Sequence, residues 1–167
     1  DKEERYRAYA SELGFWGAAM VTARETPALV QLLRQTDMPV VMVNRYLRSY
    51  DCDAVCMDNY RGGYMAVQYL LEMGHTRISH LSGPMHSTAS SDRCRGYMDA
   101  LRDNGITPDP TAVFGGNLRH DKGYEYAEHF VKNDLDYTAV FCCNDIMARA
   151  FIEQLGILGR RVPQDVS

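Results

Sequence analysis

Polar side chains follow the predicted strands, and their types could bind a ligand. In an open parallel sheet, ligands bind beyond the carboxyl ends of the strands. The residues at these positions are Asn44, Arg45, Asp58, Asn59, Ser82, Asn117, Asn144 and Asp145, with the apolar Leu118 beside Asn117. No nucleophile is paired with a base among them. The set therefore suits hydrogen bonds to a polar or polyhydroxy ligand better than covalent chemistry.

Structural roles compete with ligand binding at each of these positions. Asn144 and Asp145 precede a predicted helix. A helix N-cap is favoured for Asp145, whereas Asn144 is open between a cap and a ligand contact. A cap or a turn is favoured for Asp58-Asn59. Arg45 is open between ligand binding and simple solvation.

Arg93 is a further candidate because of its place in a helix. It lies at the start of a predicted helix whose apolar face includes Cys94 and Tyr97. A cation at that end opposes the helix dipole, so Arg93 is not there to stabilise the helix end. A bound ligand and a carboxylate partner are both open as its role.

The motifs of common enzyme and cofactor sites are missing from the sequence. The pairs Gly62-Gly63 and Gly115-Gly116 fit neither the dinucleotide-binding nor the P-loop pattern, and no G-x-S-x-G motif is present. The 5 histidines are scattered without metal-ligand spacing, and Cys52 and Cys56 lack a second pair at zinc spacing. We therefore predict a protein that is not an enzyme and uses no metal or cofactor.

Composition limits the other classes of partner. The 167 residues carry a net charge of −4 without a run of Lys or Arg, so this chain should not bind nucleic acid by itself. No apolar run approaches the roughly 18 to 20 residues that span a bilayer. The 5 cysteines, most of them in apolar contexts, indicate reduced, buried thiols in a cytosolic protein.

Strand and helix patterns alternate along the chain. Short apolar runs predict strands at residues 17–21, 39–43, 54–57, 78–81, 112–114 and 138–143. Apolar stripes with helical spacing predict helices at residues 6–13, after Thr26-Pro27, before Gly74, before Gly105, after a cap at Asp121, and at residues 145–156. This alternation is typical of an α/β fold with parallel sheets covered by helices on both faces. The pattern restarts near Gly74-His75-Thr76, which indicates a domain boundary.

Eight segments together carry a resemblance to a known family. They are residues 39–45, Asp58-Asn59 with Gly62-Gly63, residues 74–78, Ser82-Gly83-Pro84, residues 93–97 with Ala100-Leu101, Gly105-Ile106, residues 144–148 and residues 162–167. In their order and spacing they resemble the LacI/GalR transcription regulators. The resemblance implies two Rossmann-like lobes of the periplasmic-binding-protein type.

Under this resemblance, residues 1–75 form part of the first lobe and residues 76–167 part of the second. The family's helix-turn-helix, its hinge helix and the first strands of lobe one would precede Asp1, and lobe two would continue beyond Ser167. We therefore expect the chain to be a fragment of an effector-binding core. With an incomplete first lobe it would expose sheet edges and apolar faces, so we expect it to be poorly soluble or oligomeric when expressed alone.

The resemblance also implies roles for five residues. Arg93 matches an arginine that grips effector hydroxyls or a carboxylate, and Asn144 matches an effector-contacting asparagine. Asn44-Arg45 matches an Asp-Arg pair after a strand of lobe one, and Leu118 stands where an aromatic residue often stacks on the ligand. Asn44 in place of Asp removes a charged acceptor, and Leu118 in place of an aromatic weakens the case for a flat sugar face.

The implied function is that of a cytoplasmic repressor that binds a small polar effector, such as a sugar, between its lobes. Effector binding would shift the population of lobe arrangements and thereby change operator binding by a homodimer. The operator would be bound by a helix-turn-helix domain absent from this chain. The residue 145–156 helix could contribute to the dimer interface or pack only on its own sheet. A periplasmic sugar-binding protein of a transporter is the alternative.

Overall fold

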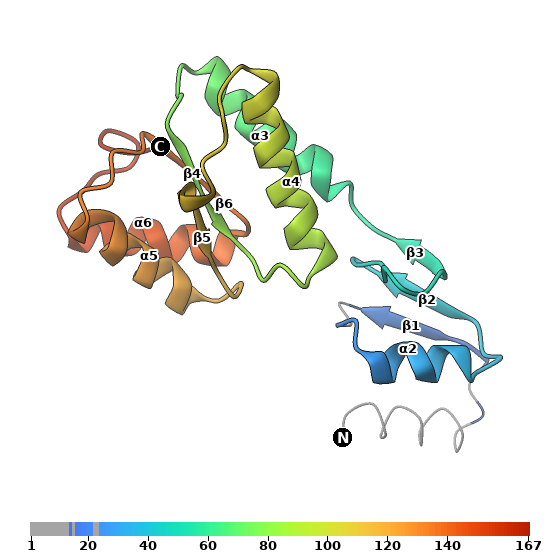
Figure 1. Ribbon diagram of the computed structural model, residues 1–167. Helices are drawn as coiled ribbons and strands as arrows, with labels where there is room; N and C mark the ends of the chain where they lie inside the picture. The colour runs from blue at the N-terminus through green and yellow to red at the C-terminus, as the bar shows by residue number, and fades with distance from the viewer. Residues whose placement is uncertain (1–13, 15, 22–23) are drawn as a thin grey trace. The chain divides into compact units, whose positions relative to one another are not determined.

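The computed structural model describes residue 14, residues 16–21 and residues 24–167, which form two compact units. The first unit comprises the described residues up to Met57 together with His86–Thr88. The second comprises Asp58–Met85 and Ala89–Ser167 (Figure 1). The predicted helix at residues 6–13 lies outside the described residues.

The first unit is a parallel three-stranded sheet with a helix on one face. Its strands are β1 (Ala18–Val21), β2 (Val40–Val43) and β3 (Asp53–Val55), in the order β1-β2-β3. Helix α2 (Pro27–Arg34) connects β1 to β2, and its Leu29 and Leu33 pack with Met42 of β2. The predicted cap is confirmed, since Oγ1 of Thr26 accepts a hydrogen bond from the Leu29 amide at 3.1 Å.

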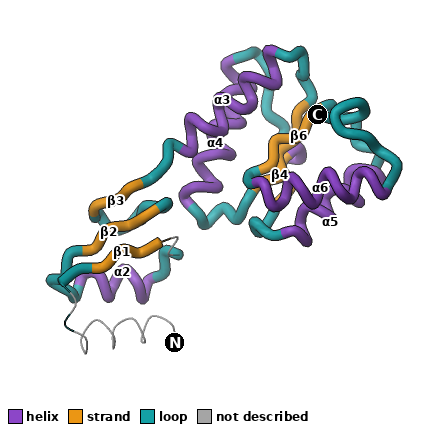
Figure 2. Tube along the Cα trace, turned by 180° about the vertical axis from the view of Figure 1, so that it is seen from behind, coloured by secondary structure: helices purple, strands orange, loops and turns teal. Residues whose placement is uncertain are grey.

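The second unit is a parallel sheet with helices on both faces. Its strands are β4 (Ile78–Ser82), β5 (Val113–Gly115) and β6 (Ala139–Cys142), in the order β5-β4-β6. Helices α3 (Asn59–Glu72) and α4 (Thr88–Asp103) cover one face, and α5 (His120–Lys132) and α6 (Asp145–Ile157) the other (Figures 1 and 2). A short 3-10 turn, η1 (Pro110–Ala112), leads into β5. The predicted α/β class with parallel sheets is confirmed.

Two separate apolar clusters stabilise this three-layer arrangement. One lies between the sheet and the α3–α4 pair and is built around Val67, Ile78 and Tyr97. The other lies between the sheet and the α5–α6 pair and includes Leu81 and Leu155. Because both faces of β4 are covered, all five of its residues are buried.

Two helix starts match or correct the sequence predictions. Asp58 caps α3 as predicted, with its Oδ1 accepting from the Arg61 amide at 2.8 Å. The cap of α6 is Asn144, and the prediction for Asp145 was wrong. Asn144 has the extended backbone that an N-cap needs, with φ −151° and ψ 166°, whereas Asp145 is already helical. The Asp145 carboxylate instead faces the positive end of the helix dipole.

The start of α5 also differs from the prediction. Asp121 was expected to cap it, but the helix begins one residue earlier, and Arg119 occupies the cap position without a side-chain hydrogen bond. The Asp121 carboxylate accepts instead from Nδ2 of Asn117 at 2.8 Å.

At the other end of the unit, α6 continues through Gly156, because an exposed glycine costs a helix only about 1 kcal/mol.

The compact units divide after Met57, because α3 packs within the second unit. The boundary near residue 75 stays a prediction about the lobes of the complete protein. Ser167 pairs with β6 through two backbone hydrogen bonds, from its amide to the Thr138 carbonyl and from the Val140 amide to its own carbonyl. Among the described residues, no helix is long and apolar enough to cross a membrane.

Candidate functional site

Three of the predicted site residues lie together at the carboxyl ends of the second unit's strands. Nη1 of Arg93, from α4, donates to the carbonyl oxygen of Cys143, directly after β6, at 2.6 Å. Nδ2 of Asn144 donates to the carbonyl oxygen of Leu118, in the loop after β5, at 3.1 Å. The site is therefore built where three parallel strands end, as expected for a ligand site in an α/β sheet.

Arg93 is held at both ends of its side chain. It is half-buried, in the second turn of α4, and its guanidinium reaches across to the end of β6. A guanidinium carries five N–H donors in a planar fork, and the Cys143 carbonyl takes one of them. The arrangement orients the fork while leaving donor capacity for a ligand. No carboxylate within the described part of the chain forms a salt bridge with it.

Asn144 has the capping role, one of the two that the sequence leaves open, and its contact with a ligand stays a prediction. Its Oδ1 caps α6 by accepting from the Met147 amide at 3.0 Å, and its Nδ2 holds the Leu118 carbonyl. Each of these two atoms can form one more hydrogen bond. The cap fixes the orientation of the amide, so a ligand would meet an asparagine whose geometry is already set.

Leu118 adopts a backbone conformation that leucine rarely takes. Its φ is +68°, in the left-handed region, and its carbonyl is fixed by Asn144. Its side chain lies over Gly83, where an added Cβ would come within 2.8 Å of Leu118 Cδ2 and 2.4 Å of Ser90 Oγ. Strained residues that surrounding contacts hold in place are common in ligand sites.

His80 is a buried residue of β4 that the sequence analysis did not select. It is fully buried, its Nδ1 lies 2.8 Å from the Phe141 carbonyl, and its ring stacks on Phe141 and Tyr97 at centroid distances of 4.7 and 5.2 Å. The pKa of His80 is lowered to about 4, mainly by burial and also by the positive charge of Arg93, although the hydrogen bond with the Phe141 carbonyl raises it. The imidazole is therefore neutral at pH 7. A histidine inside a buried strand is the signal that could have found it.

The cysteines beside Arg93 and at the end of β6 are free thiols, and two of them have raised pKa values. All five cysteines are free, with Cys94 and Cys143 buried and Cys56 exposed, so the prediction of buried thiols is only partly right. Burial raises the pKa of Cys94, and it raises the pKa of Cys142 to about 12. A raised pKa disfavours the thiolate at neutral pH, so these two thiols are weak nucleophiles.

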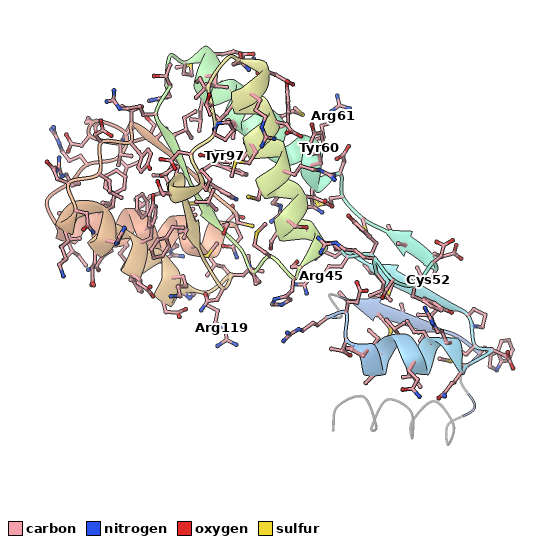
Figure 3. The ribbon with its side chains drawn as sticks, viewed as in Figure 1. Arg45, Cys52, Tyr60, Arg61, Tyr97 and Arg119 are labelled. Atoms are coloured by element: carbon pink, nitrogen blue, oxygen red, sulfur yellow. The ribbon has the colours of Figure 1, made fainter. Side chains whose placement is uncertain are left out.

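The other two predicted residues lie in the first unit, directly after β2. Asn44 is exposed with φ +70°, and its amide extends the sheet by donating to the Val55 carbonyl at 2.8 Å. Asparagine tolerates this left-handed backbone better than most residues, which gives a local reason for its presence here. Arg45 is half-buried at the start of the loop that follows β2 (Figure 3).

Glu25 fixes that loop against the start of α2. Its carboxylate accepts from the amides of Arg48 at 2.8 Å and Ser49 at 3.0 Å, and from the Ser49 hydroxyl. These hydrogen bonds, led by that of the Arg48 amide, lower the pKa of Glu25. A cavity of about 670 Å³ opens beside the loop, lined in part by Glu25, Val30, Arg34 and Arg48. The sequence analysis did not select Glu25, because its partners lie more than 20 residues away.

A family model described as "Periplasmic binding proteins and sugar binding domain of LacI family" matches residues 3–167. The chain belongs to this family. The resemblance drawn from eight short segments is thereby confirmed, and so is the expected periplasmic-binding-protein-like fold. Where the five candidate residues would touch an effector stays a prediction.

Transcription regulators of this family match the chain along its whole length. The repressor PurR of Vibrio atlanticus (strain LGP32) is 32% identical over 168 residues, covering 100% of the chain and 50% of the relative. The regulator CelR of Thermobifida fusca is also 32% identical, covering 99% and 49%. A structure of a CelR–cellobiose complex superposes with a TM-score of 0.91 at 32% identity, covering 99% of this chain and 51% of that one. The chain thus spans about half the length of the curated relatives it matches.

Proposed function

We propose that this chain is the effector-sensing part of a LacI-type transcription repressor that responds to a small polar ligand. Its whole length matches repressors and regulators of the family, none of them described as an enzyme. Operator DNA would be bound by a helix-turn-helix domain outside this chain. The regulator would act in the cytoplasm, where operator DNA is found.

The observation that carries the proposal is the pair of hydrogen bonds that fixes Arg93 and Asn144. Both side chains are anchored to main-chain carbonyls, at Cys143 and Leu118, from different elements of the second unit. Anchored polar groups bind a ligand with little loss of side-chain entropy. We propose that both contact the effector, and that Asn44, Arg45 and Leu118 contribute further contacts in the complete protein.

A sugar is the effector class that these residues favour. Arginine and asparagine can donate to several hydroxyl oxygens at fixed angles, and the asparagine oxygen can also accept from a hydroxyl. One of the related structures is a regulator in complex with cellobiose. Leu118 offers an aliphatic surface instead of an aromatic ring. We therefore expect a sugar held mainly through its hydroxyl edges rather than by ring stacking.

Effector control of DNA binding would follow from a population shift in a homodimer. The effector favours one arrangement of the lobes, and that arrangement changes how two DNA-reading domains fit their half-sites. Helix α6 exposes Ile146 and Ile152, at 44% and 49% of their surface. We propose that these two exposed isoleucines contribute to the dimer interface. The coupling between effector and operator must be reciprocal, because it is a single free energy.

The test uses the complete protein that contains this chain. Isothermal titration with cellobiose and a panel of mono- and disaccharides would identify the effector, with Arg93→Ala as the site variant. Fluorescence anisotropy with operator DNA, with and without that sugar, would measure coupling. A sugar that binds through Arg93 and changes operator affinity supports the proposal. A complete protein that binds sugar but carries no DNA-binding domain would instead be a transport-associated binding protein.

A further inference from the structure

Helices α3 and α4 cross at a contact made by two glycines. A Cβ added to Gly63 of α3 would lie 2.3 Å from the carbonyl oxygen of Arg93 and 2.9 Å from its Cα. A Cβ added to Gly96 of α4 would lie 2.2 Å from the Tyr60 carbonyl oxygen and 2.6 Å from the Tyr64 amide. The two helix backbones are therefore in direct contact, which only glycine permits.

Gly63 contacts the backbone of Arg93, the candidate effector-binding residue. Around the crossing, several side chains also link the two helices. The Tyr60 hydroxyl lies 3.3 Å from Oδ2 of Asp99, the Tyr64 hydroxyl donates to Oδ2 of Asp103 at 3.0 Å, and Arg95 lies over the Tyr60 ring (Figure 3). These links fasten the helix pair, whereas Gly63 sets how closely α4 approaches α3 at Arg93.

Arg93 is therefore held at two points, its main chain and the end of its side chain. Its main chain rests on Gly63, and its Nη1 is bonded to the Cys143 carbonyl at the end of β6. If α4 moves away from α3, the Arg93 side chain must change its torsions to keep the bond to Cys143, or lose that bond. The distance between the α3 backbone and the end of β6 therefore determines the position of the Arg93 guanidinium.

We propose that Gly63 is a positioning residue for effector binding, acting through the backbone of Arg93. This inference rests on the proposed function only in assigning the effector contact to Arg93. Ordinary contacts of a Cβ are 3.4–4 Å, so a methyl group at Gly63 must displace α4 by about 1 Å at Arg93. Binding sites tolerate errors of only about 0.5 Å in their polar groups, so effector affinity should fall.

The neighbouring Gly62 supplies a matched control. It belongs to the same helix and is exposed, and a Cβ added there meets no atom within 4 Å. Gly62→Ala and Gly63→Ala change helix propensity in the same way. They differ in the contact with α4, so any difference between the two variants reports that contact.

The experiment compares both variants in the complete protein with two measurements. The first is the affinity for cellobiose as probe, or for the tightest sugar of the panel, by isothermal titration. The second needs no ligand: the ¹⁵N guanidinium resonances of Arg93, assigned with Arg93→Lys, report whether the bond to Cys143 restricts rotation. We expect Gly63→Ala to weaken sugar binding by about tenfold or more and to shift and average the Arg93 signal. Gly62→Ala should leave both unchanged.

The two measurements separate this inference from the proposed function. A folded Gly63→Ala protein with the Arg93 signal of the unaltered protein overturns the positioning role. If that signal moves while Arg93→Lys binds the sugar normally, the positioning contact stands and the effector role of Arg93 fails. If Gly63→Ala shows no cooperative unfolding transition, Gly96→Ala opens the same crossing one turn along. Failure of both to fold, with Gly62→Ala folded, would assign the contact to folding alone and overturn the inference.

Discussion

The two parallel sheets have three strands each but hold their candidate site residues in different ways. In the second unit all five residues of β4 are buried, and Arg93 and Asn144 are anchored to carbonyls next to a packed core. In the first unit all three residues of β3 are exposed, and the loop after β2 is held by hydrogen bonds to Glu25. The candidate residues of the second unit lie beside a sheet that is covered on both faces, and those of the first unit lie on a loop held by hydrogen bonds to Glu25 and by the packing of Leu47.

This contrast indicates that the fold holds the candidate residues of the two units with different firmness. Helices cover both faces of the β4 sheet, which is the arrangement that parallel strands need for burial. Among the described residues of the first unit, the core is a single cluster between α2 and the sheet. We therefore expect the second unit to present pre-oriented ligand groups, and the first unit to adjust its loop residues on binding.

The largest expected effect is a loss of core packing in the second unit. Leu155 of α6 is fully buried, so Leu155→Ala should lower the free energy of unfolding by about 2–5 kcal/mol. Val55 of β3 is 67% exposed, and Val55→Ala should change it by no more than about 0.5 kcal/mol. Urea unfolding of the complete protein measures both. Equal losses from the two variants would contradict the proposed difference between the sheets.

A second prediction concerns the pH dependence of stability, to which the two units contribute in different pH ranges. The folded-state pKa of His80 is lowered to about 4 from 6.5. Between pH 6.5 and 4 the unfolded chain binds a proton that the folded unit excludes, so stability is complete above this window and falls as the pH drops through it. The full loss amounts to about 3 kcal/mol. Glu25, in the first unit, affects stability at lower pH. Because its folded-state pKa is lowered from 4.5, its contribution to stability is present above pH 4.5 and is lost as the pH falls below that value.

Urea titrations at pH 7.5 and 5 test this assignment. His80→Phe keeps a ring between Phe141 and Tyr97 but cannot bind a proton. Its stability should depend less on pH between these values than that of the unaltered protein. The same pH dependence in both proteins would show that another group is responsible.

The sequence predicted the elements well because their signals are local. Short apolar runs marked the strands, and Thr26 and Asp58 cap helices within three residues of their partners. The choice between Asn144 and Asp145 failed because both residue types cap helices, and only the backbone dihedrals decide.

The site was only partly predictable, because its decisive contacts join distant residues. Arg93 meets a carbonyl 50 residues away, and Gly63 meets the backbone of Arg93, 30 positions on. The two adjacent glycines look alike in the sequence, yet a Cβ added to Gly63 would collide with α4 and one added to Gly62 would meet no atom within 4 Å. His80 was missed because its hydrogen-bond partner, the Phe141 carbonyl, lies 61 residues away.

The third prediction compares the two arginines of the candidate site. Arg93→Ala should weaken effector binding by about 1.5–3 kcal/mol, the usual contribution of a charged hydrogen bond. Arg45→Ala should cost less, because Arg45 lies on the loop after β2, outside the core that covers both faces of the second unit's sheet. Isothermal titration of the complete protein gives both values. A thermal transition within a few degrees of the unaltered protein would establish that Arg93→Ala remains folded. The reverse ranking of the two affinities would move the main effector contact to the first unit.

The smallest expected effect concerns the two non-glycine residues that have left-handed backbones after strands. Asn44 has φ +70° and is exposed, whereas Leu118, with φ +68°, is held by Asn144 and packs over Gly83. Asn44→Gly should be neutral within about 0.5 kcal/mol, and Asn44→Ala should lower stability by about 1 kcal/mol through backbone strain alone. Leu118→Gly removes the strain but also the packing, so it should not stabilise the protein. Urea unfolding decides between these cases. A stabilising Leu118→Gly would mean that this side chain is held for the ligand and not for the fold.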